Sequence, residues 1–573
     1  MMKHVLHIEM PRALTAGVRE FDVRAFLQLE KSNVKFSQVD INSRFWKFIF
    51  RKYAPQFEGS ICAIFESDTL HVQDYLTVAS GLILIGEQLL PLGLNIKTSG
   101  LFPTEESKLS SSSEIRDVLC GPIRDLINDF IAQTDAYYCF EKFDLISIGI
   151  TGKNSFLLAF GIADYLQLNH PEVKLCVGKH HYENFSFLLT LDKILHAKTL
   201  FYSFPFISLY EEKMGDMILG ILSGDQNQFT NTAWLNNDQV FVRQPGGKVS
   251  QFNALTEGCK RALLEYISDA DIVPSNIHYN MQLVGNQCYY SRCTFCAQIN
   301  KHIDKTVYEE NEAVTLSVAV IEELHKSGVY YFSFTDEALR PADLLRLTKA
   351  IEKIRLRIIW NMRLIANTRL TSDLIEKLYQ CGCREILFGL ETIDTDMARV
   401  LGKVSSGDDL GDITNLVFAC THKGIGVVLS MIYGLPGFTE QKESELIEYA
   451  SRMLIHNPLV LFIFNRFELF GGTVMYREPE RFGITFVEAQ SSGADLDNSY
   501  KFQPVTISKR SEVSFQILNL HPCVKAEEVM MSNQMNDLFQ IFRHFRYASF
   551  GFTFQQKKNQ DLYKELSSNY ERV

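Results

Sequence analysis

One segment, Asn286-Gln287-Cys288-Tyr289-Tyr290-Ser291-Arg292-Cys293-Thr294-Phe295-Cys296, determines how the rest of the chain is interpreted. It places three cysteines at the spacing C-x4-C-x2-C, directly after an alternating, strand-like run from Ile277 to Val284. Three thiolates on one short loop can hold three irons of a [4Fe–4S] cluster, because cysteine thiolate is the usual ligand of such clusters. The fourth iron would then be open to a small molecule.

Two other interpretations of the same cysteines stay open at this point. One is a zinc site formed by the three cysteines and His302, since zinc also binds closely spaced cysteines together with a histidine. The other is a set of three unrelated core thiols, because free cysteine often behaves as a small buried hydrophobic residue.

The sequence that follows the cysteines resembles the radical S-adenosylmethionine (radical SAM) enzymes over about 200 residues. Their usual signature is C-x3-C-x2-C with an aromatic residue before the last cysteine, and this chain has Phe295 there and a first gap one residue longer. Further segments that resemble the family's motifs follow in the family's order, namely Tyr330–Glu337, Phe388–Thr392 with the trailing Leu401-Gly402-Lys403, Tyr433–Glu440 and Gly471–Tyr476.

The resemblance implies reductive cleavage of S-adenosylmethionine to a 5′-deoxyadenosyl radical, which removes a hydrogen atom from an unactivated carbon. The cofactors carry this chemistry, while the protein positions the reactants and excludes water. Implied partners are a peptide or small-molecule substrate and a reducing protein of the flavodoxin or ferredoxin type.

The resemblance also assigns site residues one by one. It makes Cys288, Cys293 and Cys296 the cluster ligands and places Phe295 against the adenine. Asp336 and Glu337 stand where the family binds the methionine amine, although this chain lacks the family's glycines at that element, so their assignment rests on position and charge. The remaining assignments are Glu391 near the ribose, Arg363 facing the carboxylate, and Gly434, Pro436 and Gly437 in the loop beside the adenine. Each of these carboxylates also has an interpretation as a surface or helix-capping acid, and Arg363 has one as a surface base.

Composition restricts the class of protein. The chain has 573 residues, a net charge of −11 and no block of basic residues. A nucleic-acid partner normally requires a cationic surface, so binding to DNA or bulk RNA is not expected. No apolar run reaches about 18 residues, and the first residues lack the apolar core of a signal peptide. We therefore expect a cytoplasmic protein without a membrane partner, in which the other nine cysteines are reduced.

The pattern of strands and helices predicts an α/β protein with four regions. Residues 1–125 are expected to form a mixed α/β region, and residues 126–270 a Rossmann-like doubly wound domain. The stretch from Ser107 to Glu114, with Ser110 to Ser113 in a row, resembles a linker but could equally be a solvated loop within one domain. Residues 271–495 are expected to form a partial (β/α)6 barrel of the TIM type, with the motifs at the carboxyl ends of its strands. Residues 496–573 should cover the open side of the barrel, chiefly through a helix over Asn533–Arg546.

The Rossmann-like region resembles the cobalamin-binding domain that precedes the barrel in one large radical SAM class. Here the family's final Gly-Gly turn is Gly178-Lys179, and no D-x-H-x-x-G sequence is present. A lysine at the second position would crowd an approaching corrin ring. Cobalamin is therefore a further candidate cofactor rather than an established one.

Three hypotheses follow for the function. The first is a radical SAM enzyme acting on a peptide or natural-product intermediate, with C-methylation leading and with epimerisation or cross-linking by hydrogen abstraction as alternatives. The second is a relative of the tRNA methylthiotransferases, disfavoured because the N-terminal region lacks a second cysteine triplet. The third is a zinc-stabilised barrel that serves as a non-catalytic binding module.

Overall fold

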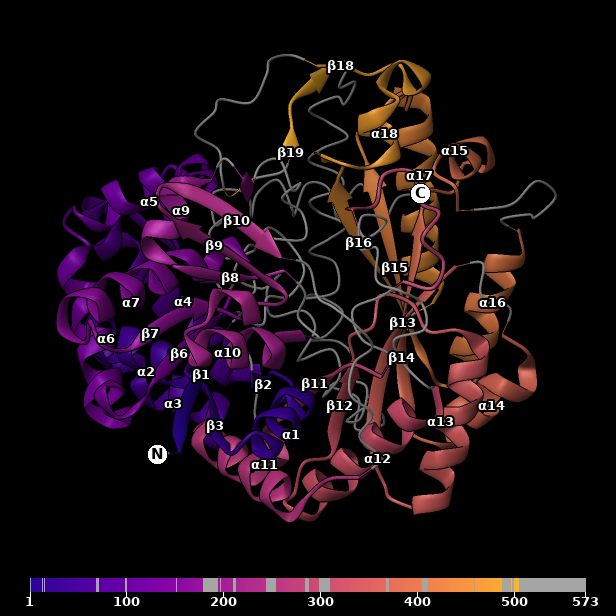
Figure 1. Ribbon diagram of the computed structural model, residues 1–573. Helices are drawn as coiled ribbons and strands as arrows, with labels where there is room; N and C mark the ends of the chain where they lie inside the picture. Colours follow the sequence, from indigo (N-terminus) through magenta and orange to yellow (C-terminus); the bar gives the residue numbers. More distant parts are fainter. Residues whose placement is uncertain are drawn as a thin grey trace.

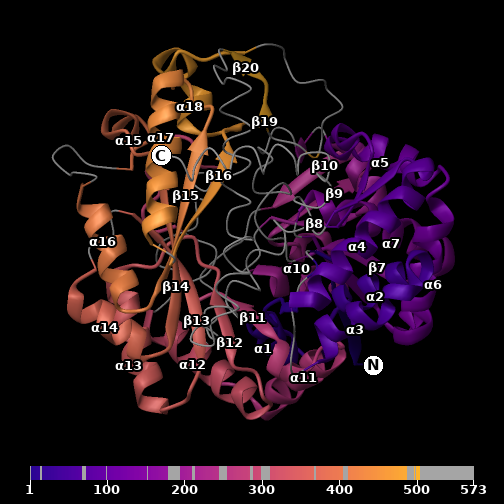
Figure 2. The same cartoon turned by 180° about the vertical axis from the view of Figure 1, so that it is seen from behind.

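The computed structural model describes residues 2–503, except for 13, 15, 68–71, 98–99, 151, 179–193, 196, 210–212, 244–253, 284–287, 298–309, 367–369, 404–410, 458, 487–495 and 497–498. These residues form two units that lie side by side, each built on a seven-stranded sheet (Figures 1 and 2). The expected helix over Asn533–Arg546 and the tail that would cover the barrel lie outside the described residues. None of the described helices combines the length and the apolar character needed to cross a bilayer.

The N-terminal unit contains a doubly wound sheet with the order β10-β9-β8-β7-β6-β1-β3. Its parallel strands are β1 (Lys3–Glu9), β3 (Val34–Asp40), β6 (Leu145–Gly149), β7 (Lys174–Val177) and β8 (Phe206–Ser208). In chain order these five strands have the arrangement 2-1-3-4-5, which is that of the flavodoxin-like doubly wound fold. The Rossmann-like topology expected from the sequence is therefore present.

The sheet does not divide where the sequence suggested a division. β1 pairs with β6, so residues before and after position 125 belong to one sheet. The serine run is packed rather than linker-like, because Leu109, Ser112 and Ile115 are all buried where helix α5 (Ser112–Leu119) begins. The run resembles a linker in composition, but the apolar residues on either side of it hold it against the core.

A hairpin extends this sheet at one of its edges. Strands β9 (Thr232–Asn236) and β10 (Gln239–Arg243) are antiparallel and joined by Asn237 and Asp238. Both linking residues have positive φ, at 48° and 62°. Such a two-residue turn matches the twist of antiparallel strands, and asparagine and aspartate tolerate it better than most side chains.

Helices cover both faces of the N-terminal sheet. They are α1 (Val23–Lys31), α2 (Asn42–Tyr53), α3 (Glu58–Glu66), α4 (Val72–Leu89), α5, α6 (Arg124–Tyr138), α7 (Phe156–Asn169), α9 (Lys198–Ser203), α10 (Met214–Ser223) and α11 (Glu257–Asp269). A short hairpin of β4 (Leu94–Lys97) and β5 (Gly100–Pro103) lies beside them.

The second unit is the partial barrel, with six consecutive parallel strands in the order β16-β15-β14-β13-β12-β11. They are β11 (His278–Met281), β12 (Tyr331–Phe334), β13 (Ile359–Ile365), β14 (Cys383–Glu391), β15 (Gly426–Tyr433) and β16 (Val460–Arg466). Helices α12 (Glu310–Lys326), α13 (Pro341–Ile354), α14 (Ser372–Gln380), α15 (Thr395–Val400), α16 (Gly411–His422) and α17 (Glu440–His456) connect successive strands. β11 lies within the strand-like run expected from Ile277 to Val284, and the six-strand count is confirmed. After β16 come α18 (Val474–Arg477) and the short strands β17 (Leu469–Phe470), β18 (Thr485–Phe486), β19 (Ser499–Tyr500) and β20 (Phe502–Gln503).

Side-chain alternation identifies the two faces of the barrel wall. Tyr279 and Met281 of β11 face residues of α12, so they point outward. The residue between them, Asn280, therefore points inward, and the register aligns it with Ser333 and, beyond that, Asn361. The Ser333 hydroxyl donates to Asn361 Oδ1 over 2.7 Å, which forms a polar layer inside the barrel.

The two units share backbone and side-chain contacts. β2 (Gly17–Val18), from the N-terminal unit, pairs in parallel with β11 and so forms the seventh strand of the barrel sheet. Close by, the Phe21 amide donates to the hydroxyl of Tyr279 over 2.8 Å, and both residues are fully buried. The N-terminal unit is thus fixed to the first strand of the barrel.

We expect Tyr279→Phe to destabilise the protein by about 1–3 kcal/mol, because the buried Phe21 amide loses its acceptor. Thermal unfolding followed by calorimetry measures the loss as a lower midpoint temperature. Tyr330→Phe is the matched control, since Tyr330 is 40% exposed and its hydroxyl can be replaced by water contacts. An unchanged midpoint in Tyr279→Phe would show that this hydrogen bond does not contribute to stability.

Candidate functional site

The cysteine loop lies against a turn that follows the fourth barrel strand. The amide of Thr294 donates to the Leu401 carbonyl over 3.0 Å, and its hydroxyl donates to the Val400 carbonyl over 2.9 Å. The hydroxyl of Tyr290 donates to the Gly402 carbonyl over 2.6 Å. Residues between the cysteines therefore help to hold the loop in place.

Gly402 allows this close contact. Its φ is +71°, and a Cβ atom at this position would lie 2.5 Å from the carbonyl oxygen of Arg292. Only glycine adopts such a backbone conformation readily and also leaves that space open. The cysteine loop thus packs against the Leu401-Gly402-Lys403 motif.

A second contact joins the loop to the last of the family motifs. The Met475 amide donates to the Thr294 carbonyl over 3.0 Å. Met475 lies in α18, whose first turn is capped by the Thr473 hydroxyl. The expected segment Gly471–Tyr476 therefore packs directly on the cysteine loop.

A buried ion pair lies beside the cysteines. Lys403 Nζ is 2.9 Å from Glu391 Oε1, and the two side chains are only 9% and 10% exposed. Lys403 also donates to the Gly389 carbonyl over 3.1 Å. A side chain at position 389 would meet both charged groups, within 2.9 and 3.1 Å, so the glycine of the Phe-Gly-Leu-Glu motif makes room for the pair.

Glu391 reaches this position through an irregular strand end. The register of β14 shifts between Gly389 and Glu391, and Glu391 has a φ of +67°. A left-handed conformation is uncommon for a residue other than glycine and marks a locally strained backbone. The strain occurs where the Glu391 carboxylate turns toward Lys403.

The charges of the site act on one another. Burial raises the pKa of the Cys293 thiol, and the neighbouring Lys403 ammonium opposes that rise. Burial alone would lower the pKa of Lys403, but the Glu391 carboxylate and the Cys293 thiolate outweigh it and leave the pKa above its ordinary value. Lys403 Nζ also lies 5.7 Å from the centre of the Phe295 ring. A lysine that stays protonated therefore lies among the cysteine thiols.

Asp336 and Glu337 follow the end of β12, next to the cysteine loop. Asp336 is fully buried and its carboxylate accepts the Leu283 amide over 2.8 Å. Two residues later, Ala338 forms a parallel bridge with Cys288. The structure thus brings this acidic element beside the first cysteine, and it gives Asp336 a structural contact within the strand ends.

Arg363 and the loop after β15 are placed at the same end of the barrel. Arg363 lies two residues beyond Asn361 on β13, so its side chain points inward, and it is partly exposed. Gly434 and Gly437 flank Pro436 with φ values of +71° and +77°, and nothing lies within 4 Å of where either Cβ would be. The predicted site residues therefore converge on the carboxyl ends of the barrel strands.

A separate polar cluster occupies the carboxyl ends of β1 and β6 in the N-terminal sheet. His7 Nδ1 is 3.1 Å from Ser147 Oγ, and His7 Nε2 is 3.3 Å from Glu9 Oε1. A Cβ at Gly149 would lie 2.7 Å from Glu9 Oε2, and one at Gly178 would lie 2.1 Å from Ser147 Oγ. The spaces beside both glycines are thus filled by this chain's own side chains. Lys179, which the sequence singled out, lies outside the described residues.

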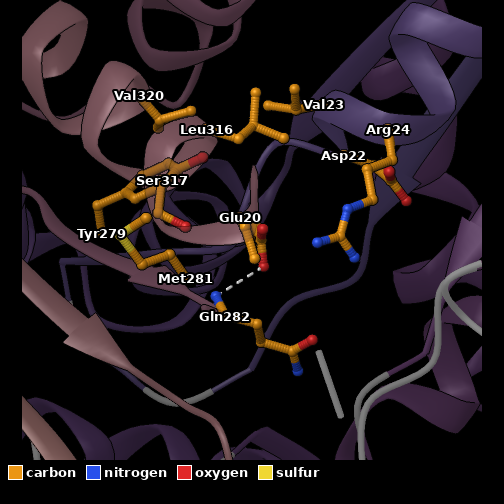
Figure 3. A pocket seen from close by; sticks show the side chains of 11 residues that line it. Glu20, Asp22, Val23, Arg24, Tyr279, Met281, Gln282, Leu316, Ser317 and Val320 are labelled. Atoms are coloured by element: carbon orange, nitrogen blue, oxygen red, sulfur yellow. Dashed lines mark hydrogen bonds between the residues drawn. The ribbon is translucent and has the colours of Figure 1, made fainter. Parts of the chain in front are cut away.

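A hollow opens between the two units on the outer side of β11 (Figure 3). Glu20 and Arg24 face it from the N-terminal unit, and Glu20 Oε2 accepts the Gln282 amide over 3.1 Å. Tyr279 and Met281 line it from the barrel. Because these residues face away from the barrel interior, the hollow is distinct from the region where the predicted site residues meet.

The three cysteines suit an iron–sulfur cluster better than a single zinc ion. None of them is in a disulfide. Sulfur ligands of one tetrahedral zinc lie about 3.8 Å apart, given zinc–sulfur bonds of about 2.3 Å. Among the described residues, the one set of three potential ligand atoms within 4.8 Å of one another is Asp135, Glu141 and His170 in the N-terminal unit. The three cysteine sulfurs therefore do not all lie within 4.8 Å of one another, which is compatible with thiolates on three different irons. His302, the fourth ligand in the zinc hypothesis, lies outside the described residues.

The sequence indicates no role for Lys403, although the motif that contains it resembles one of the family's motifs. A lysine in a turn is usually a solvated residue, so nothing in the residue type indicated burial. The neighbouring Leu401 and Gly402, which seat the turn against the loop, were the available signal. The contacts of Tyr290 and Thr294 had no sequence signal, because both are hydrogen bonds to distant carbonyl groups.

Comparisons with known proteins agree with this arrangement. Residues 283–450 match the family model of the radical SAM superfamily. The structure of the radical S-adenosylmethionine methyltransferase TsrM from Kitasatospora setae, with cobalamin and a [4Fe–4S] cluster bound, is similar over 90% of this chain and 89% of its own, at 12% identity and a TM-score of 0.53. The structure of OxsB, a cobalamin-dependent S-adenosylmethionine radical enzyme with aqua-cobalamin bound, is similar over 100% of this chain and 75% of its own, at 11% identity and a TM-score of 0.54. The likeness is one of fold and spans both units, while no curated protein sequence matches.

We expect Gly402→Ala to loosen the cysteine loop, because the added methyl group would collide with the Arg292 carbonyl and strain the backbone. The measurement is iron and sulfide content after anaerobic reconstitution, which should fall well below that of the unaltered protein. Gly483→Ala is the control, since it has a φ of +63° but open space around its Cβ. Equal iron content in both variants would show that the Gly402 contact does not organise the loop.

Proposed function

We propose, on the premise that this chain belongs to the radical SAM superfamily through residues 283–450, that it is an enzyme that modifies an unactivated carbon of a peptide or natural-product substrate. The observation that carries the proposal is the cysteine loop, seated at the carboxyl ends of the barrel strands with the buried Lys403–Glu391 pair beside it. A [4Fe–4S] cluster bound there would supply the electron that cleaves S-adenosylmethionine to the 5′-deoxyadenosyl radical. A reducing protein of the flavodoxin or ferredoxin type is the proposed electron source.

The chain's own residues would hold and shield these groups. Cys288, Cys293 and Cys296 would bind the cluster, and Phe295, which packs partly against the core, would lie against the adenine. Glu391, inside the barrel mouth, would accept a hydrogen bond from the ribose. The inward-facing Arg363 would contact the carboxylate, and Glu337, in the element beside Cys288, would contact the amine. Asp336 would act through its hydrogen bond to Leu283, which fixes the neighbouring strand ends.

C-methylation is the leading reaction within this proposal. Its support is the likeness of fold over both units to a protein described as a methyltransferase with bound cobalamin. The alternative is hydrogen abstraction without cobalamin, as in an epimerase or a cross-linking enzyme. The filled spaces beside Gly149 and Gly178 support this alternative, because this chain's own side chains occupy them. No step of the reaction is therefore assigned to cobalamin.

Cys420 is not suited to return a hydrogen atom in the alternative reaction. It is fully buried in α16, two residues before the end of the helix and six residues before the start of β15. That position is at the amino ends of the strands, opposite the motif loops. Burial also raises its pKa to about 12. Cys523, another thiol of the chain, lies outside the described residues.

We predict that Cys293→Ala abolishes cluster assembly, because the loop then supplies too few thiolates to hold the cluster. The test is anaerobic reconstitution with iron and sulfide, followed by iron analysis and by an assay for cleavage of S-adenosylmethionine. Cys259→Ala is the control, since Cys259 is buried in α11 of the N-terminal unit. A Cys293→Ala protein that holds about four irons per chain would remove this cysteine from the ligand set.

We predict that Glu391→Gln retains the cluster but weakens binding of S-adenosylmethionine by roughly 1.5–3 kcal/mol, because a charge-assisted hydrogen bond is lost. Equilibrium dialysis of the reconstituted protein measures the dissociation constant. An affinity equal to that of the unaltered protein would assign Glu391 to the scaffold alone.

Anaerobic purification from cells supplied with cobalamin decides between the two reactions. On the C-methylation proposal, we expect stoichiometric corrin in the visible spectrum. A protein with a working cluster and no corrin would contradict methylation through cobalamin and leave hydrogen abstraction.

A further inference from the structure

Lys403 carries a charge that the proposed assignments leave without a role. Its side chain is 9% exposed, so water does little to screen it. A lysine is rarely buried unless it is paired, and keeping one inside a protein costs several kcal/mol of desolvation per ion. The Glu391 carboxylate offsets that cost, but a pair of apolar side chains would fill the same space without it.

The ammonium group of Lys403 lies close to the cysteine loop. Lys403 Nζ lies 5.7 Å from the centre of the ring of Phe295, the residue directly before Cys296. The ammonium also opposes the rise in the pKa of the Cys293 thiol that burial causes. Gly402, directly before Lys403, would place a Cβ 3.7 Å from the Cα of Cys293. The same turn that packs against the loop therefore brings a positive charge to the cysteine thiols, and the Glu391 carboxylate is paired with that charge over 2.9 Å.

We propose that Lys403 sets the reduction potential of the cluster, with the Glu391 carboxylate partly offsetting its charge. This inference rests on the proposed function. When the cluster accepts one electron from its reductant, it becomes more negative by one charge. A buried cation beside its thiolates stabilises that reduced state, because the attraction is strong at short distance in a medium of low dielectric. The Glu391 carboxylate, which is paired with the cation, weakens this stabilisation of the reduced state.

Two substitutions at this pair should therefore move the potential in opposite directions. Lys403→Met keeps the length of the side chain but removes the positive charge, so the cluster should become harder to reduce. Glu391→Gln leaves the lysine charge uncompensated, so the cluster should become easier to reduce. Damage to packing alone would not produce shifts of opposite sign.

The experiment is a reductive titration of reconstituted protein with titanium(III) citrate, without S-adenosylmethionine, in which electron paramagnetic resonance measures the reduced cluster. We expect at least a tenfold change in the reduced-to-oxidised ratio at a fixed potential, equivalent to about 59 mV for one electron. The shift should be negative for Lys403→Met and positive for Glu391→Gln. Lys403→Arg keeps the positive charge, so its cluster should have a reduction potential close to that of the unaltered protein.

Lys442→Met is the matched control. Lys442 forms an ion pair with Asp394 at the same distance of 2.9 Å in the same unit, but it is 31% exposed. The cluster of the Lys442→Met variant should have the same reduction potential as that of the unaltered protein.

The outcomes separate this inference from the proposed function. If the unaltered protein takes up no cluster, the proposed function fails. If a cluster forms but the two variants shift the potential in the same direction or not at all, the role of Lys403 is overturned. If Lys403→Met cannot hold about four irons, the reduction potential of Glu391→Gln tests the inference by itself. A positive shift supports the role of Lys403, and a negative shift or none overturns it.

Discussion

The close approach of Gly402 to the Arg292 carbonyl is the contact on which the site depends. A loop with three cysteines has no regular structure of its own, so its backbone needs hydrogen-bond partners elsewhere. The turn after α15 supplies carbonyl groups to Tyr290 and Thr294, and α18 supplies an amide to Thr294. Because these partners come from two different barrel loops, they hold the backbone of the cysteine loop from two sides.

The turn that holds the cysteine loop also supplies the positive charge beside it. By placing Lys403 directly after Gly402, the chain brings a cation to the thiols with the same few residues that position them. Glu391 completes the arrangement from the end of β14, at the cost of an irregular backbone. Strained conformations of this kind persist where the surrounding structure over-determines them, and here the buried ion pair and the room beside Gly389 do so.

The sequence was sufficient to predict the barrel and not sufficient to predict how the N-terminal residues join it. Strand and helix periods located β11 to β16 because each strand is buried by the helices around it, which gives a strong apolar pattern. The pairing of β1 with β6 could not be found this way, since parallel partners are set by three-dimensional packing across more than a hundred residues. Similarly, the burial of Lys403 depends on Glu391 and on two loops that are distant in sequence, whereas the cysteine spacing is purely local and was evident at once.

The two-residue strand β2 has a further consequence for the open barrel. An unclosed sheet ends in strands with free backbone groups, and such edges can pair with other molecules and aggregate. Gly17 and Val18 occupy that position beside His278 and Tyr279, so the first barrel strand is not an edge. The N-terminal unit therefore covers the edge of the barrel sheet at β11. A chain shortened to the barrel alone would present β11 as a template for strand addition, whatever the state of its cysteine loop.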